Sequence, residues 1–216
     1  MKKPIGRFHV ITNEAIQNRF SHARLAEMAI AGGADLIQLR DKDRSTSELV
    51  AAASEVHAVC RASGIPLIIN DRADIALAVG ADGVHLGRND LPIAAARSLL
   101  GPQAIIGGTA SDLEQARQVE RDGADYVGFG HIYPTNSKNK TGAAMGTAPL
   151  ADVCRALHIP VVAIGGIDEH NLAPVLDSGA WGVAVIAAVC AANDPARAAA
   201  GVAELIHSRR KFGEDL

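Results

Sequence analysis

Apolar runs of strand length alternate along the chain with stretches whose apolar residues recur every three or four positions. The short runs predict buried strands, because parallel strands covered on both faces are almost continuously apolar. The other stretches predict amphipathic helices, and Ser111 and Glu114 are spaced like a capping box at the start of one of them. Helical spacing is clearest at residues 23–30, 47–62 and 112–121. Single strands are predicted at residues 7–12, 67–70, 104–109 and 161–166.

An eight-residue pattern occurs four times, each copy consisting of a Gly that can end a helix, a short turn and an apolar run. The copies span residues 33–40, 80–87, 123–130 and 179–186. They lie roughly 50 residues apart, or about two βα units, which places one copy on every second strand of a barrel. Together with the single strands, the repeat predicts an α/β fold, the (β/α)8 TIM barrel. A doubly wound open sheet is the structural alternative.

The chain has 216 residues, which is near the lower limit for such a barrel and enough for one core. No low-complexity linker interrupts it, so we predict a single domain over residues 1–216, with a polar tail from about residue 208. A net charge of −3 gives no indication of nucleic-acid or membrane binding.

Three cysteines without a CxxC pair argue against a disulfide framework and favour a reducing compartment. The first residues are too polar for a signal peptide, and no apolar run is long enough to span a bilayer. We therefore expect a cytoplasmic protein. The sequence leaves the oligomeric state open, and a homo-oligomer is compatible with it.

Candidate chemistry gathers at the predicted carboxyl ends of the strands, where barrels of this class carry their active sites. Gln38 and Arg40 point the same way from one strand, and Lys42 follows that strand. An arginine fork and a lysine charge at the barrel mouth suit a phosphate or a diphosphate. The alternatives are solvated cations or an ion pair with Asp41 or Asp43. Gln38 lies deeper, where filling the barrel is an alternative role.

Acidic residues follow the next two strands. Asn70 and Asp71 end one strand and Asp90 comes shortly after the other, and these two strands are neighbours in a barrel. Two carboxylates beside a cationic pocket imply a hard divalent ion, and Mg2+ with a bound diphosphate is the usual pairing. The alternative is helix capping, because Asp is common at helix starts.

A long polar loop, residues 130–142, follows the sixth strand and differs from the short connections expected elsewhere. Its Thr135, Ser137 and Lys138 could close over an anionic ligand, or the loop is a plain surface connection. After the last two strands, glycine and small residues let backbone N–H groups approach a phosphate. These positions are Gly165, Gly166, Ile186 and Ala187.

Two histidines are placed by the predicted strands. His85 aligns with Gln38 in the repeat, which predicts a core position with satisfied hydrogen bonds. His131 follows the sixth strand at the barrel mouth, where it is either a general acid or base or a structural hydrogen-bonding residue. We expect the remaining histidines at the surface or in helices.

In combination these motifs resemble the thiamine-phosphate synthase (thiamine-phosphate pyrophosphorylase) family. The matching segments are Gln38-Leu-Arg-Asp-Lys42, Ile69-Asn-Asp-Arg72, Gly80-Ala-Asp-Gly-Val-His-Leu-Gly87 with Asp90, Tyr133-Pro-Thr-Asn-Ser-Lys138 and Ala163-Ile-Gly-Gly-Ile167. Their order and spacing are far more specific than any single motif. The resemblance implies an Mg2+-dependent transferase that joins a hydroxymethylpyrimidine diphosphate to a thiazole phosphate. Diphosphate is released and thiamine phosphate is formed.

The resemblance also implies roles for individual residues. The diphosphate would contact Arg40, Lys42, Asn70, Thr109 and Lys138, and Mg2+ would be held by Asp71 and Asp90. The thiazole phosphate would contact Thr135, Ser137 and the amides of Gly166, Ile186 and Ala187. Gln38 completes the substrate-binding set.

Some positions depart from the family pattern: Arg88, Ser137 and Ala187 stand where Gln, Thr and Ser are usual, and the departure at His131 bears on the activity. His131 stands where the synthases usually have Pro, and it resembles the proton-transferring histidine of the related thiazole tautomerases. Those relatives tend to lose the diphosphate and metal residues that this chain keeps. Two alternatives therefore stand beside the synthase. One is a thiazole tautomerase, an isomerase using His131, and the other is a non-catalytic regulatory barrel that binds a thiamine precursor.

Overall fold

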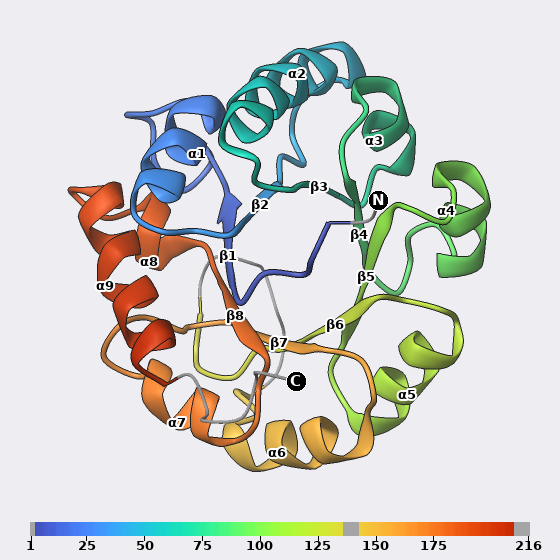
Figure 1. Ribbon diagram of the computed structural model, residues 1–216, viewed down its shortest axis with the longest axis vertical. Coiled ribbons are helices and arrows are strands. Elements are labelled where there is room, and N and C mark those ends of the chain that lie inside the picture. The colour runs from blue at the N-terminus through green and yellow to red at the C-terminus, as the bar shows by residue number, and fades with distance from the viewer. Residues whose placement is uncertain (1–2, 136–142, 210–216) are drawn as a thin grey trace.

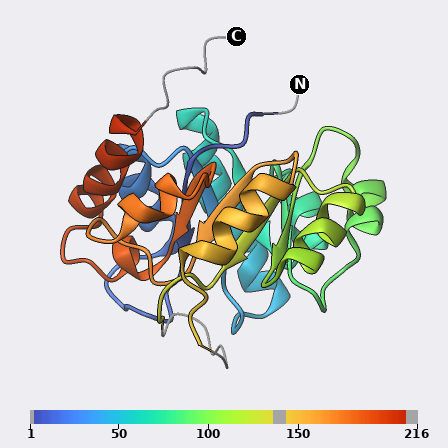
Figure 2. The same cartoon turned by 90° about the horizontal axis from the view of Figure 1, so that it is seen from below.

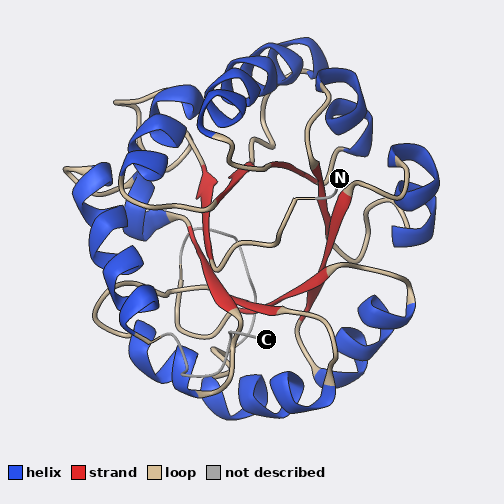
Figure 3. Cartoon of the chain, in the orientation of Figure 1, coloured by secondary structure: helices blue, strands red, loops and turns tan. Residues whose placement is uncertain are grey.

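The computed structural model describes residues 3–135 and 143–209. Within them, eight parallel strands pair in sequence order and β8 pairs with β1, so the sheet is closed. Figures 1 and 3 show the strands as an inner ring with the helices outside it. The strands are β1 (Phe8–Thr12), β2 (Leu36–Leu39), β3 (Leu67–Asn70), β4 (Gly83–Leu86), β5 (Ile105–Ala110), β6 (Tyr126–Gly130), β7 (Val161–Ile164) and β8 (Gly182–Val185). The predicted (β/α)8 TIM barrel is confirmed, and the open-sheet alternative is wrong.

Helices follow the strands and cover the outside of the barrel, as the side view in Figure 2 shows. They are α1 (His22–Ala31), α2 (Thr46–Ser63), α3 (Ala73–Val79), α4 (Ile93–Leu100), α5 (Leu113–Arg121), α6 (Thr147–Ala156), α7 (Leu172–Asp177), α8 (Ala187–Cys190) and α9 (Pro195–Ser208). The three stretches with helical spacing correspond to α1, α2 and α5. Across the described ranges, no helix is both long and apolar enough to cross a bilayer. The predicted polar tail begins where α9 ends, and its residues 210–216 lie outside the described part of the chain.

The repeated pattern forms β2, β4, β6 and β8 together with the turn that leads into each of them. The first glycine of every copy has a left-handed backbone, with φ of 95° at Gly33, 68° at Gly80, 88° at Gly123 and 94° at Gly179. Residues with a Cβ rarely adopt this conformation, so glycine lets the chain leave a helix and turn directly into a strand. The prediction of one copy on every second strand is therefore confirmed.

Apolar side chains fill both faces of the closed sheet. One cluster lies between the strands and the helices, and a second fills the barrel itself. The buried members of the inner cluster are Ile11, Leu36, Ile68, Ile105, Tyr126, Val162, Ala184 and Ile186. Because these side chains close the interior, a ligand has access only to the ends of the barrel.

One predicted helix start is wrong in detail. Ser111 does not cap α5, because the helix begins one residue later than a box at that position requires. Asp112 caps it instead, accepting the Gln115 N–H at 2.8 Å. A complete capping box occurs at Ser45 and Glu48, at the start of α2.

The expectation for the remaining histidines is wrong for His9. It lies on β1 with 1% of its surface exposed, because that strand is buried on both faces. Its Nε2–H donates to the Gly6 carbonyl at 2.8 Å, and its ring meets Tyr126 edge-on. Burial outweighs this hydrogen bond and lowers the pKa of His9 to about 4. His22 is helical as expected, yet it is also 1% exposed.

Candidate active site

Three strand ends bring a lysine and two carboxyl groups together at one rim of the barrel. Lys42 follows β2, Asp71 follows β3 and Asp90 lies beyond β4. Lys42 Nζ is 2.8 Å from Asp71 Oδ2. The carboxyl groups of Asp71 and Asp90 lie close enough to shift each other's pKa. The structure thus brings together the two acidic residues that the strand order placed on neighbouring strands.

The pKa values of the two carboxyl groups shift in opposite directions. Burial alone would raise the pKa of Asp71, but its contacts with Lys42 and Asp90 hold that pKa below its usual range. Burial raises the pKa of Asp90, and the Asp71 carboxylate raises it further, against the opposing hydrogen bond from the Gly87 N–H. Carboxyl groups this close favour sharing a proton, and the same oxygens suit a hard divalent cation in its place.

Neither carboxyl group caps a helix, so the capping alternative is wrong. α3 begins after Arg72 and α4 after Pro92, and neither helix has a side-chain cap. Asp90 accepts the Gly87 N–H at 2.7 Å, which closes the turn after β4. Asp71 has a φ of 64°, a left-handed conformation that no other non-glycine residue adopts in the described ranges. Such a backbone costs about 1–3 kcal/mol and is typical of functional sites.

Gln38 and Arg40 carry polar atoms that lack partners. Gln38 lies inside the barrel with 3% exposed surface. Its Oε1 and the Nε of Arg40 are buried and have no hydrogen-bond partner among the described residues. An unsatisfied buried polar atom costs free energy, so both atoms are candidates for ligand contacts.

The alternative ion pairs with Asp41 and Asp43 are wrong. Asp41 Oδ2 lies 3.1 Å from His22 Nε2 and 3.0 Å from Arg44 Nε. Lys42 pairs with Asp71 across the rim. Asp43 forms no ion pair with the residues that the structure describes. The two cations of this segment therefore remain available to the rim.

Polar side chains flank the end of β4. His85 Nδ1 lies 2.9 Å from the Tyr126 hydroxyl and its Nε2 lies 2.9 Å from the Thr109 hydroxyl, so the predicted core histidine with satisfied nitrogens is confirmed. Thr109 is near the end of β5, and Asn70 is the last residue of β3. Since β3 and β5 are the neighbours of β4, Asn70 and Thr109 lie on either side of the strand that leads to Asp90.

A cavity of about 460 Å3 occupies the other half of the rim, at the ends of β6, β7 and β8. The predicted residues that line it are His131, Thr135, Gly165, Gly166, Ile186 and Ala187. Among its lining residues in the described ranges, Asp168 is the one carboxylate and there is no lysine or arginine. A phosphate here would be bound mainly by backbone N–H groups and hydroxyls.

Glycine is required where β7 leaves the sheet. φ is 103° at Gly165 and 67° at Gly166. A Cβ at Gly165 would lie 2.4 Å from the Cβ of His131, and one at Gly166 would lie 2.5 Å from the carbonyl oxygen of Pro134. The Tyr133 N–H also donates to the Gly165 carbonyl at 2.9 Å. The exits of β6 and β7 therefore pack directly against each other and shape the cavity.

Two predicted site residues lie outside the described part of the chain, and three residues near the site were not predicted from the sequence. Ser137 and Lys138 lie outside the described residues, so their contacts stay predictions. Sequence reasoning missed Glu14, His22 and Arg44, which interact with one another and with Asp41. Glu14 and Arg44 are 30 residues apart, and no motif links them. Only their location in the sequence could have indicated them, because Glu14 and Arg44 follow the predicted first and second strands.

Comparison with known proteins identifies the family to which the chain belongs. A family model described as thiamine monophosphate synthase matches residues 8–189. The chain belongs to this family. Thiamine-phosphate synthases of Salinibacter ruber and Chlorobium luteolum are each 50% identical, over 92% and 84% of this chain and 88% and 86% of theirs. Thiamine phosphate pyrophosphorylase from Pyrococcus furiosus superposes with a TM-score of 0.85 at 35% identity, covering 94% of this chain and 96% of that one.

Membership of the thiamine monophosphate synthase family identifies a transferase of thiamine biosynthesis. The resemblance inferred from the five motifs is confirmed. The named relatives are similar to this chain over most of their own length, so the barrel corresponds to the main body of each of them.

Proposed function

We propose that the two halves of the rim bind the two substrates of thiamine phosphate synthesis. The half at β2, β3 and β4 takes the hydroxymethylpyrimidine diphosphate, and the cavity at β6, β7 and β8 takes the thiazole phosphate. The cluster of Lys42, Asp71 and Asp90 carries this proposal, because it places a cation and two metal-binding carboxyl groups on the same rim as the cavity lined by Gly165 and Gly166.

Mg2+ would be held by Asp71 and Asp90. Their carboxyl groups lie close enough to shift each other's pKa, offer only oxygen ligands and lie beside Lys42, so they fit a hard cation that arrives with a diphosphate. When bound, Mg2+ would stabilise the negative charge that develops on the departing diphosphate.

The reaction forms one C–N bond and breaks one C–O bond. The neutral thiazole nitrogen attacks the methylene carbon of the pyrimidine, and diphosphate leaves with the electron pair of the C–O bond. Arg40 and Lys42 would neutralise charge on the leaving group, one as a fork and the other as a point charge. No strong base is required, in keeping with His85, whose two ring nitrogens are both occupied by hydroxyls.

Neutral side chains would orient the substrates around these charges. The unpaired Gln38 Oε1 would accept a hydrogen bond from the pyrimidine. Asn70 and Thr109 would contact the diphosphate from the strands on either side of β4. Thr135 and the amides of Gly166, Ile186 and Ala187 would contact the thiazole phosphate, and the resemblance adds Ser137 there and Lys138 at the diphosphate.

A turnover assay with purified protein tests the proposal. With both substrates and Mg2+, mass spectrometry should detect thiamine phosphate and diphosphate, and EDTA should abolish the reaction. Asp71→Asn is the informative variant, because Asn tolerates the left-handed φ of 64° and removes only the charge. We expect it to lower kcat/KM at least about a hundredfold.

Asp74→Asn is the matched control for that variant. Asp74 has an exposed side chain and pairs with Arg72 rather than with the rim, so its loss should leave turnover unchanged. Full turnover in EDTA, or equal rates for the two variants, would contradict the metal site. A barrel that only binds a thiamine precursor would convert nothing at any Mg2+ concentration.

His131 supports a second candidate activity. It lines the cavity together with Thr135, so a thiazole carboxylate phosphate bound there would lie beside an imidazole. A tautomerase would lose its activity in His131→Asn and keep it in Asp71→Asn, whereas the synthase requires Asp71. Aromatisation of the thiazole by the wild-type protein, followed by absorbance, separates the two activities. Its absence would remove the second.

A further inference from the structure

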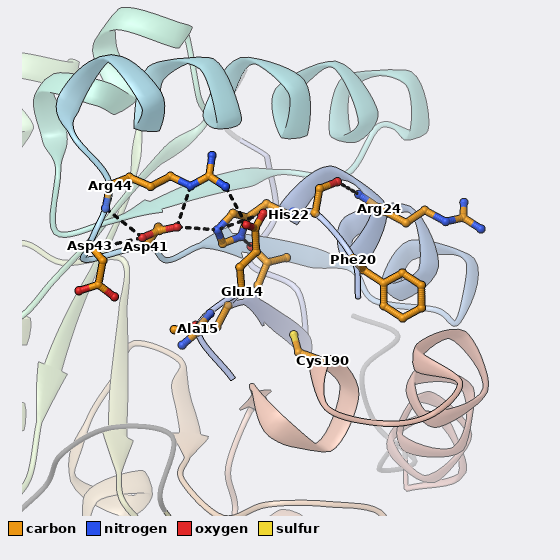
Figure 4. Close-up of polar contacts among 12 residues, drawn as sticks. Glu14, Ala15, Phe20, His22, Arg24, Asp41, Asp43, Arg44 and Cys190 are labelled. Carbon is orange, nitrogen blue, oxygen red and sulfur yellow. Dashed lines mark hydrogen bonds and ion pairs between the residues drawn. The ribbon is translucent and has the colours of Figure 1, made fainter. Parts of the chain in front are cut away.

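Figure 4 shows a network of side chains around Asp41, here called the Asp41 network. Its members are Thr12, Glu14, His22, Asp41 and Arg44. His22 is 1% exposed, and its Nδ1 and Nε2 lie 2.8 Å from Thr12 Oγ1 and 3.1 Å from Asp41 Oδ2. Arg44 binds Asp41 Oδ2 at 3.0 Å and Glu14 Oε2 at 2.7 Å. The network joins the end of β1, the start of α1 and the loop after β2.

The Asp41 network is an ion-pair network rather than a metal centre. Glu14, His22 and Asp41 offer ligand atoms that lie within 4.8 Å of one another. Arg44 already contacts both carboxylates, and its charge would repel a divalent cation at the same place. Both nitrogens of His22 are also engaged. The function of the network therefore depends on what Asp41 holds.

Asp41 uses both carboxylate oxygens to hold a turn. Oδ2 accepts from the side chains of His22 and Arg44. Oδ1 accepts the backbone N–H groups of Asp43 and Arg44, at 3.1 Å and 3.3 Å. Because a carboxylate only accepts, His22 Nε2 carries the proton in this contact. Burial alone would raise the pKa of Asp41, but the hydrogen bonds to its two oxygens help to hold that pKa below its usual range.

The turn held by Asp41 carries both cations of the diphosphate half. Arg40 and Lys42 are its neighbours in sequence. The Arg40 N–H donates to the Thr12 carbonyl at 3.3 Å, so the segment is attached to β1 on one side and to Asp41 on the other. The Lys42 side chain is 56% exposed, and Arg40 forms no ion pair within the described ranges. The positions of both cations therefore depend on the backbone that carries them.

We propose that His22 is a positioning residue for diphosphate binding, because by holding Asp41 it fixes the turn from which Arg40 and Lys42 reach the ligand. The inference rests on the proposed function, since it requires the diphosphate at this half of the rim. His22 is buried beneath the turn and acts through Asp41. Loss of its Nε2 contact should therefore weaken binding of the diphosphate substrate. Binding of the thiazole phosphate, which is proposed for the other side of the barrel, should not change.

Two substitutions at His22 separate its contacts. The amide nitrogen of Gln can take the place of ring Nε2 and donate to Asp41, whereas Asn reaches only as far as ring Nδ1 and Thr12. We expect His22→Asn to raise KM for the pyrimidine diphosphate about tenfold or more, and to leave KM for the thiazole phosphate within about twofold. His22→Gln should restore most of the loss. Asp41→Asn, which keeps the shape and removes the charge, should show the same selective loss as His22→Asn.

Calorimetric binding of inorganic diphosphate with Mg2+ tests the inference without turnover. The affinity should fall about tenfold or more in His22→Asn and remain close to wild type in His22→Gln. Equal affinity in wild type and His22→Asn, with Asp41→Asn also unchanged, would overturn the positioning role. So would an equal loss for both substrates in His22→Asn and His22→Gln, because that marks a general loss of structure. Failure of the wild-type protein to bind diphosphate would instead overturn the proposed function, and the inference with it.

Discussion

Gly166→Ala should reduce both stability and thiazole phosphate binding, and Gly64→Ala isolates the part due to backbone strain. Both glycines have a left-handed backbone, with φ of 67° and 71°. A Cβ at Gly64 would meet nothing within 4 Å. A Cβ at Gly166 would lie 2.5 Å from the carbonyl oxygen of Pro134 and 2.8 Å from the Cβ of Tyr133. The two variants therefore share the strain and differ in the steric contact.

The size of each effect follows from these contacts. An alanine in the left-handed region costs about 1–2 kcal/mol. Gly64→Ala should lower the free energy of unfolding by about 1 kcal/mol, which lowers Tm by about 2–4 °C in a chain of this size. Gly166→Ala adds an overpacking cost of about 1–3 kcal/mol, for a total of about 3 kcal/mol. The atoms that must move belong to the loop after β6, which lines the cavity together with Gly166.

Urea unfolding and steady-state kinetics measure the two consequences. In Gly166→Ala we expect KM for the thiazole phosphate to rise about tenfold or more, equivalent to about 1.4 kcal/mol of lost binding. KM for the pyrimidine diphosphate should change much less, because that substrate is proposed for the opposite half of the rim. Gly64→Ala should keep wild-type kinetics. The reasoning is refuted if Gly166→Ala is no less stable than Gly64→Ala and binds the thiazole phosphate normally.

His9 should make stability depend on pH. Its folded pKa of about 4 lies below the ordinary value of 6.5, so the unfolded chain binds the proton more readily and stability falls as the pH drops below 6.5. From about pH 7.5 to pH 5 the wild type should lose about 2 kcal/mol relative to His9→Gln in urea melts, and parallel curves would contradict this. His158→Gln, at an exposed histidine, should follow the wild type. Lys42→Met should raise the pKa of Asp71, but it also removes a positive charge 2.8 Å from a metal-binding oxygen. At pH 8 metal titration should therefore show a lower Mg2+ concentration for half-maximal activity, while kcat/KM for the pyrimidine diphosphate falls. An unchanged Mg2+ requirement would count against the contact between Lys42 and the metal-binding carboxylates.

The sequence by itself determined the barrel and the rim. The glycine of each repeat marks the point where a helix ends and a strand begins, and that local signal depends only on backbone sterics. Once the strands are ordered, residues at their carboxyl ends must share one rim, whatever lies between them in the chain. This is why the sequence alone is enough to predict that Gln38, Arg40, Asp71 and Asp90 lie near one end of the barrel.

Only the tertiary structure decided how these groups pair. Lys42 could have bound Asp41 or Asp43 beside it, yet it binds Asp71 across the rim, while His22 and Arg44 occupy Asp41. Local sequence cannot distinguish these outcomes, because each pairing is electrostatically reasonable. The choice depends on which side chains the packed helices and loops bring within hydrogen-bonding distance. The contacts that separate the pKa values of Asp71 and Asp90, with Lys42 and with each other, are likewise a property of the folded chain.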